Sequence, residues 1–247
     1  AIIDELRATP QIRFILTRHE QGAAFMAYGF ARAGNRPAVV TATEGPGVTN
    51  LATGIAAANR GNVPVISICG VQESVVRERD STQDMDQVTF MKPMTKWAYS
   101  IPNVEKVQEL VRKAFRVALT EPQGPTHIEA SSEILLEQTT VEAIAPENYR
   151  HNILPTCDAA QLDAVFALLN KSKQPVFVVG RGLINENATA AMAALAEQTG
   201  IPVGALQYTP DAFPTSHPLA LGPLGRSGFG SANRIVPQAD LIICIGA

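Results

Sequence analysis

The 247-residue sequence predicts an α/β fold, with a parallel sheet sandwiched by helices followed by a second, incomplete α/β domain of Rossmann-like type. Three observations support this prediction. Short apolar runs of strand length alternate with longer segments of helical periodicity. Glycine or proline separates many of these segments. Repeated strand–helix units of this length require parallel strands, and helices then cover both faces of the sheet.

The first half of the chain supplies most of these units. Strands are expected at 14–17, 38–43, 65–69 and 126–130, and helices at 2–6, 20–33, 48–60 and 104–119. Gly34 and Gly61 follow two of the helices, because glycine readily adopts the left-handed conformation that closes a helix. In the segment 104–119 apolar residues recur three and four positions apart, which predicts a helix with one buried face.

The alternation stops at residues 132–157, which contain four glutamates and two prolines in no clear period. Such a composition is typical of a linker. We therefore predict a first domain over 1–131 and a second over 158–247. The chain opens inside a helical pattern and stops on an apolar run typical of a core strand, so we expect further residues at both ends.

In the second domain the strand–helix alternation resumes. Asp158 is placed to cap a helix, because its side chain can accept a hydrogen bond from a backbone N–H of the first turn. A strand is expected over 175–179. A further helix is expected from Asn187 to about Thr199, closed by Gly200.

Composition argues against several classes of protein. The net charge of −3 leaves no basic surplus to hold a phosphate backbone, so nucleic acid is not expected as a partner. No apolar run approaches the ~20 residues of a membrane helix, so no membrane partner is expected either. Cys69, Cys157 and Cys244 lie far apart without paired metal-ligand spacing, which favours free thiols in a reducing cytoplasm.

Polar residues follow the predicted strands of the first domain, where open parallel sheets usually bind ligands. Glu20 comes directly after the strand at 14–17 and begins a helix rich in glycine and alanine. An apolar helix of this kind indicates burial, for example at a subunit interface. Glu20 is then either a carboxylate in a binding site or an ordinary helix-start acid favoured by the helix dipole.

Two further motifs occur at the ends of the next strands. Residues 43–50 read T-E-G-P-G-V-T-N, in which Gly45 and Pro46 form a tight turn that lets the backbone approach a ligand. The alternative is an ordinary strand-to-helix turn. Residues 70–72 and 80–86 form the third motif, which is either part of the same site or a solvated polar loop.

Glycine-rich segments also occur in the second domain, at 180–182 and 221–230. Either could approach a nucleotide phosphate, and the alternative is a pair of flexible turns. Neither contains a full G-x-G-x-x-G fingerprint with a distal acid. His217 is expected to be a loop residue rather than a catalyst.

In this order and spacing, the motifs resemble the thiamine-diphosphate enzymes related to acetolactate synthase. Residues 18–32 match R-H-E-x-G-A-A-x-M-A-x-G-x-A-R, and 43–50 resemble T-S-G-P-G-x-x-N. Residues 70–72 match G-x-Q, 80–86 resemble D-x-F-Q-E-x-D, and 217–225 match H-P-L-x-L-G-x-x-G. The resemblance covers essentially the whole chain.

The resemblance implies a pyrimidine-binding domain at 1–131 and part of a central domain at 158–247. It implies that Glu20 hydrogen-bonds a ring nitrogen of the cofactor and so activates it, and that Gln83 reaches the reacting centre. An apolar surround is expected to raise the pKa of the Glu20 carboxyl. The implied cofactor-binding residues are Glu20, Thr43, Gly45, Pro46, Asn50 and Gln83.

The implied reaction is thiamine-diphosphate-dependent carboligation or decarboxylation of a 2-keto acid by a cytoplasmic homodimer or homotetramer. A related lyase, acyl-CoA decarboxylase or acetyltransferase is the alternative, and a non-catalytic nucleotide-binding or scaffold homologue is the second alternative. The stretch that holds Mg²⁺ and the diphosphate in this family is absent from the chain, so no metal ligand is predicted here.

Several residues depart from the family pattern. Glu44 stands where the family usually has serine, and Thr82 replaces an aromatic residue beside Gln83. Pro122 replaces the arginine that contacts FAD in flavin-binding members, and Arg226 replaces a frequent histidine. FAD is therefore the less favoured outcome at the central domain.

Overall fold

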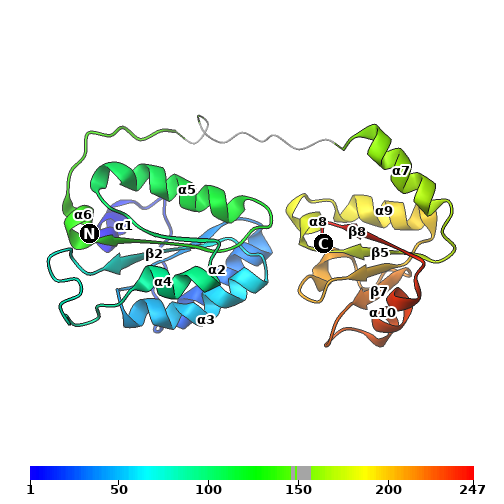
Figure 1. Cartoon of the computed structure of the whole chain (residues 1–247), viewed down its shortest axis with the longest axis horizontal. Helices are drawn as coiled ribbons and strands as arrows, with labels where there is room; N and C mark the ends of the chain where they lie inside the picture. Colours follow the sequence, from blue (N-terminus) through cyan, green and yellow to red (C-terminus); the bar gives the residue numbers. More distant parts are fainter. Residues whose placement is uncertain (146–147, 149–156) are drawn as a thin grey trace. The chain divides into compact units, whose positions relative to one another are not determined.

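The computed structural model describes residues 1–145, 148 and 157–247. The chain divides into two compact units, Ala1–Tyr149 and Arg150–Ala247. Each unit contains a four-stranded sheet in which every strand pair is parallel, and helices cover the sheet (Figure 1). The predicted α/β class is therefore confirmed.

The sheet of the first unit has the strand order β1-β2-β4-β3. Its strands are β1 (Ala38–Val40), β2 (Val65–Val71), β3 (Trp97–Ser100) and β4 (Thr126–Ser131). The helices are α1 (Ile2–Ala8), α2 (Glu20–Gly34), α3 (Pro46–Arg60), α4 (Gln87–Met91), α5 (Val107–Leu119) and α6 (Ser132–Leu136). Figure 1 shows α5 on one face of the sheet and α3 and α4 on the other.

The side chains of β2 alternate between two cores, as expected for a central strand with both faces covered. Val65 and Cys69 belong to the core beneath α2 and α3. Ile66 belongs to the core beneath α5. By the same alternation, His127 and Glu129 of β4 point to the opposite face from Ile128, and all three are buried.

Helices α2 and α3 pack closely against each other. A Cβ atom added to Gly54 of α3 would lie 2.4 Å from the Cβ of Ala24 of α2. Carbon atoms normally approach to about 3.5–4.0 Å, so only glycine permits this crossing. The crossing brings the first turns of the two helices together.

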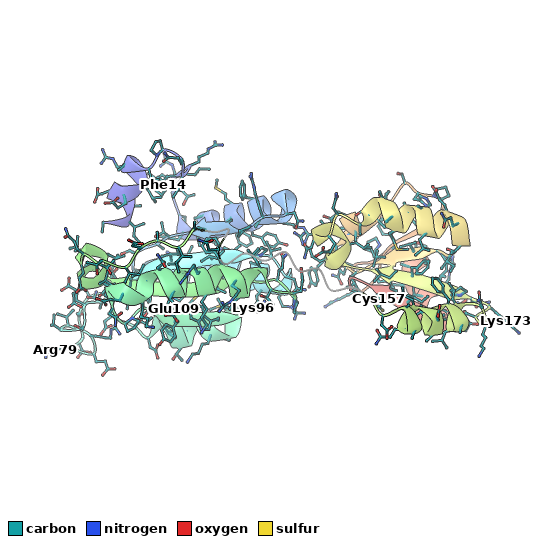
Figure 2. All side chains as sticks on the ribbon, turned by 90° about the horizontal axis from the view of Figure 1, so that it is seen from above. Phe14, Arg79, Lys96, Glu109, Cys157 and Lys173 are labelled. Carbon is teal, nitrogen blue, oxygen red and sulfur yellow. The ribbon has the colours of Figure 1, made fainter. Side chains whose placement is uncertain are left out.

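The predicted strand at 14–17 is wrong. This segment forms no strand in the structure, and Phe14, Ile15 and Leu16 are 42%, 53% and 84% exposed. Figure 2 shows Phe14 in the segment between α1 and α2, outside the sheet. A strand requires a hydrogen-bonding neighbour, and an apolar run in the sequence does not show whether one is present.

Smaller differences concern element ends and short elements. Asn35, at φ 47°, takes the left-handed cap position predicted for Gly34. Val104–Lys106 forms a 3-10 turn before α5. The short elements α4 and β3 were not predicted, and the predicted linker at 132–157 begins with α6. Within that linker, residues 146–147 and 149–156 lie outside the described part of the chain.

The sheet of the second unit has the order β7-β6-β5-β8. Its strands are β5 (Pro175–Val179), β6 (Val203–Ala205), β7 (Ala220–Pro223) and β8 (Leu241–Ile245). Its helices are α7 (Ala159–Leu169), α8 (Arg181–Asn185), α9 (Thr189–Thr199) and α10 (Gly230–Ile235). Among the described residues, no helix is both long and apolar enough to cross a membrane.

Two of the three predicted helix ends in this unit are confirmed. The Asp158 carboxylate accepts a hydrogen bond of 3.1 Å from the backbone N–H of Ala160, and Gly200 closes α9 at φ 68°. Helix α9 begins at Thr189 rather than at Asn187. Asn187 has φ 54°, a left-handed conformation that asparagine tolerates better than most residues and that cannot open a helix.

Candidate functional site

Two of the predicted site residues, Glu20 and Asn50, meet where α2 and α3 begin. Glu20 is the first residue of α2, after His19, whose extended backbone and ring nitrogen cap the helix. The Asn50 side-chain amide donates a hydrogen bond of 3.0 Å to Glu20 Oε2. Both residues lie one helical turn before the contact between Ala24 and Gly54. The close helix crossing therefore holds the pair together.

Glu20 is partly buried, and the pKa of its carboxyl differs from the prediction. Its own backbone N–H and then the Asn50 amide donate to the carboxylate, and these two hydrogen bonds hold the pKa of Glu20 below its ordinary value of 4.5. The predicted increase in pKa is wrong for this chain, because the opposing effect of burial is smaller than the effect of the hydrogen bonds.

The predicted Gly-Pro-Gly turn and Gln83 also come together. Gly45 has φ 63° and is the residue before α3, with Pro46 at the first helical position. A Cβ atom on Gly45 would lie 2.6 Å from the backbone oxygen of Gln83 and 2.9 Å from its Cβ. The loop that carries Gln83 therefore packs directly on the turn, and a side chain at position 45 would displace it.

Neighbouring polar residues extend this surface. Thr43 Oγ1 donates to Glu44 Oε2 at 3.2 Å. A Cβ atom on Gly70 would lie 2.7 Å from that same carboxylate oxygen, so Glu44 reaches across the end of β2. Gln72 Nε2 donates to the backbone oxygen of Thr82 at 2.7 Å, which ties two parts of the third motif together.

The sequence did not predict a row of buried, hydrogen-bonded side chains beneath the Gly45 turn. This row begins at Gln87. The Gly45 N–H donates to Gln87 Oε1 at 2.7 Å. Gln87 Nε2 donates to the Gly70 oxygen at 2.9 Å and to Glu129 Oε2 at 2.8 Å. His127 Nε2 lies 3.5 Å from the same Glu129 oxygen, and its Nδ1 lies 2.8 Å from Ser67 Oγ.

The sequence contained one signal for this row of buried polar side chains. His127 and Glu129 are two positions apart in a strand whose other residues are small or apolar, so they share one face of a buried strand. Buried polar side chains on one face indicate a hydrogen-bonded network. No comparable signal marks Gln87, which follows a run of polar loop residues.

Comparison with known proteins identifies the family. The model described as "Thiamine pyrophosphate enzyme, N-terminal TPP binding domain" matches residues 1–90, and the model of the central domain matches residues 162–247. The chain belongs to the thiamine pyrophosphate enzymes. The Glu20–Asn50 pair and the Gly45 turn both lie within the region that matches the TPP-binding domain.

Curated relatives agree with this family. The large subunit of acetolactate synthase isozyme 1 from Escherichia coli K12 is 36% identical over 100% of this chain and 43% of its own length. The acetolactate synthase large subunit from Corynebacterium glutamicum is 33% identical over 100% of this chain and 40% of its own length. The sulfoacetaldehyde acetyltransferase from Alcaligenes xylosoxydans xylosoxydans is 32% identical over 98% of this chain and 40% of its own length. The chain thus spans less than half the length of these relatives.

A solved structure supports the same fold. A crystal structure from Mycobacterium smegmatis, assigned to the thiamin diphosphate-dependent enzymes, superposes with a TM-score of 0.79. It is 29% identical in sequence and covers 96% of this chain and 45% of its own. The parallel sheets with flanking helices are therefore the fold of this thiamine pyrophosphate enzyme.

Close contacts within the second unit account for several glycines of its two glycine-rich segments. Cβ atoms on Gly180 and Gly182 would lie 2.5 and 2.6 Å from backbone atoms of Gly246. The Asn233 side chain bonds both the N–H and the carbonyl of Gly225, at 3.0 and 2.8 Å. Close backbone contacts account for Gly180 and Gly182, and the approach of either segment to a nucleotide phosphate stays a prediction.

Two other features of the second unit lie apart from these loops. His217 is a loop residue, as predicted: its Nδ1 accepts a hydrogen bond of 3.2 Å from the Leu219 N–H. A cavity of about 410 Å³ is lined by residues that include Gln174, Pro202 and Ala239. Gln174 and Pro202 immediately precede β5 and β6, and Ala239 lies two residues before β8, so the cavity lies at the opposite ends of the strands from the glycine-rich segments.

Proposed function

We propose that the full-length protein is a thiamine-diphosphate-dependent carboligase or decarboxylase that acts on a 2-keto acid, with Glu20 activating the cofactor. One observation carries this proposal: the Glu20 carboxylate is held by Asn50 beside the Gly45 turn, in a chain that matches a TPP-binding domain. Support for the reaction type comes from relatives named acetolactate synthase at 36% and 33% identity.

The residues around Glu20 fit the pyrimidine end of this cofactor. A carboxylate offers about four acceptor positions, and the backbone N–H and Asn50 engage two of them. The remaining positions are available to a ring nitrogen, because Glu20 is only partly buried.

Each residue then has a defined task. The bound cofactor supplies the electron sink for decarboxylation of a keto acid. With the cofactor bound, Glu20 would share a proton with a ring nitrogen, and Asn50 would keep the carboxylate in place. Thr43 and Pro46 would line the bound cofactor, and Gln83, which packs directly on Gly45, would reach the substrate.

The remaining components of the proposal lie outside this site. No three His, Cys, Asp or Glu side chains gather as metal ligands in the described ranges, and we infer that Mg²⁺ is held by other residues of the protein. FAD is not included, because Pro122 supplies no cation at the position where flavin-binding relatives use arginine. Phe25, Met26 and Phe30 are exposed on α2, which supports a homodimer or homotetramer.

A second candidate activity is acetyl transfer. The relative named sulfoacetaldehyde acetyltransferase is 32% identical over 98% of this chain, and it matches the chain nearly as well as the synthases do. Lyase and acyl-CoA decarboxylase chemistry would use the same cofactor-activating residues. A non-catalytic scaffold would need neither the Glu20–Asn50 pair nor the Gly45 turn.

The decisive experiment measures thiamine-diphosphate-dependent carbon dioxide release by the full-length protein from a panel of 2-keto acids, with sulfoacetaldehyde as a separate substrate. Glu20→Gln should reduce turnover about a hundredfold or more, which is the range for removal of a proton-transferring group. The matched control is Glu105→Gln, an exposed residue outside the site. Near-normal turnover by Glu20→Gln would reject the role of Glu20, and absence of both turnover and cofactor binding in the wild type would favour the scaffold.

A further inference from the structure

The buried amide of Gln87 joins three separate strand ends. We propose that Gln87 is a positioning residue for cofactor binding, and that the buried carboxylate of Glu129 holds Gln87 in its working orientation. This inference rests on the proposed function, because the position that it fixes is that of the cofactor turn. Gln87 is 1% exposed and Glu129 is 3% exposed, so water does not compete for their hydrogen bonds.

The amide contacts are distributed over the ends of β1, β2 and β4. Through Oε1, Gln87 accepts from Gly45 in the turn after β1, and through Nε2 it donates to Gly70 in β2 and to Glu129 in β4. These contacts span 42, 17 and 42 residues of sequence. One side chain thus fixes the spacing of three strand ends at the predicted ligand-binding edge of the sheet.

Only one orientation of the Gln87 amide matches its donor and acceptor atoms to the groups around it. If the oxygen and nitrogen of Gln87 were exchanged, the NH₂ group would face the Gly45 N–H. The oxygen would then face two acceptors, the Gly70 carbonyl and the Glu129 carboxylate. A carboxylate has acceptors only, so Glu129 selects the orientation in which Gln87 presents its oxygen to Gly45.

The hydrogen bond from the Gly45 N–H to Gln87 Oε1, called the tether below, acts on the site through the backbone. Gly45 is the residue from which α3 begins, and Asn50 follows within the same helix and binds Glu20. Gln83 packs on Gly45 from the other side and lies four residues before Gln87. Fixing the Gly45 N–H therefore fixes both the partner of Glu20 and the loop that carries Gln83.

His127 and Ser67 extend the chain below Glu129. His127 Nε2 is 3.5 Å from the carboxylate, and Ser67 Oγ is hydrogen-bonded to His127 Nδ1 at 2.8 Å. Both residues are 0% exposed. His127 therefore packs against the same Glu129 oxygen that accepts from Gln87, and its ring is held in place by Ser67.

The test uses the full-length protein and two readouts. Isothermal titration calorimetry gives the dissociation constant for thiamine diphosphate with magnesium, and hydrogen–deuterium exchange of the cofactor-free protein reports on the Gly45 amide. The variants are Gln87→Leu, Gln87→Glu and the exchange Gln87→Glu/Glu129→Gln. The control is Gln108→Leu, which removes a side-chain amide of α5 that donates to the backbone oxygen of Glu142, away from the site.

Gln87→Leu should weaken cofactor binding about tenfold to a hundredfold and speed exchange at Gly45 about tenfold, because it leaves a buried N–H and a buried carboxylate without this partner. Exchange at the centres of β2 and β4 should stay unchanged. Gln87→Glu should be at least as damaging, because it faces Glu129 with a like charge. The double variant should recover part of the loss, since an amide again meets a carboxylate.

Cofactor affinity within twofold of wild type in Gln87→Leu, with unchanged exchange at Gly45, would overturn the inference. A double variant whose losses simply add would overturn the role of Glu129. If Gln87→Leu does not fold, Gln87→Asn carries the test, because it keeps the amide but shortens its reach by one methylene. A wild type that binds no thiamine diphosphate would instead reject the proposed function, and exchange at Gly45 would still decide whether the tether exists.

Discussion

The contact between Ala24 and Gly54 predicts a large effect from a single added methyl group. In Gly54→Ala the new Cβ would start 2.4 Å from the Cβ of Ala24, 3.0 Å from the Ala24 carbonyl carbon and 3.1 Å from the Phe25 nitrogen. Since carbon atoms are in contact at about 3.5–4.0 Å, the two helices must separate by roughly 1 Å. The Glu20–Asn50 hydrogen bond, now 3.0 Å, lies one turn away and would lengthen beyond hydrogen-bonding distance.

The change in the free energy of unfolding caused by Gly54→Ala has three contributions. Overpacking a tight core contact costs about 1–3 kcal/mol. Alanine in place of glycine stabilises a helix interior by about 1 kcal/mol. Loss of the Asn50–Glu20 hydrogen bond costs about 1 kcal/mol, below the roughly 1.5–3 kcal/mol typical for a charged group, because Glu20 is only partly buried. The net expectation for Gly54→Ala is a destabilisation of about 1–3 kcal/mol, together with weaker cofactor binding.

Urea unfolding and calorimetric cofactor titration test this expectation. Gly29→Ala is the matched control in α2, because a Cβ there meets nothing within 4 Å, and it should stabilise the helix by about 1 kcal/mol. The exchange Ala24→Gly/Gly54→Ala returns one methyl to the crossing and should recover most of the loss. An unchanged stability and affinity in Gly54→Ala, or no recovery in the exchange, would refute the packing argument.

Three further predictions address charge and loop structure. In the cofactor-free protein the pKa of Glu20 should lie below 4.5, and a titration by side-chain carbon NMR with a midpoint above that value contradicts the assigned hydrogen bonds. Hydrogen bonds hold the pKa of Asp240 below 3.8, so Asp240→Asn should lower stability at pH 7 but not after the pH has fallen through the folded-state pKa. Asn233→Ala should destabilise the second unit by about 1–2 kcal/mol in urea unfolding, because it releases both backbone groups of Gly225.

The sequence predicted those parts of the fold that depend on local pattern. The central strand β2, with apolar residues on both faces, and the cap of α7 by Asp158 could be read directly from residue types. The strand at 14–17 could not be judged in this way, since its existence depends on a neighbouring strand. Short elements such as α4 were missed because five residues contain too little periodicity to distinguish a helix from a polar loop.

The candidate site was predictable only in part for a related reason. Contiguous sequence motifs contain Glu20, Gly45 and Asn50, so these residues could be identified from the sequence. The contact between Glu20 and Asn50 could not. Gln87 and Glu129 form no local motif, and their contact spans 42 residues. Recognition of such a pair requires knowledge of which strand ends are adjacent, and that is information about topology.

The pKa of Glu20 connects this geometry to the proposed chemistry. Two hydrogen-bond donors favour the ionised carboxylate in the chain as it stands, whereas proton sharing with a ring nitrogen requires a carboxyl that also accepts a proton readily. Burial acts in that direction, and here it is the weaker effect because Glu20 is only partly buried. A cofactor ring against Glu20 would exclude water from its carboxyl. The proposed function therefore requires the cofactor itself to raise the pKa of the group that activates it.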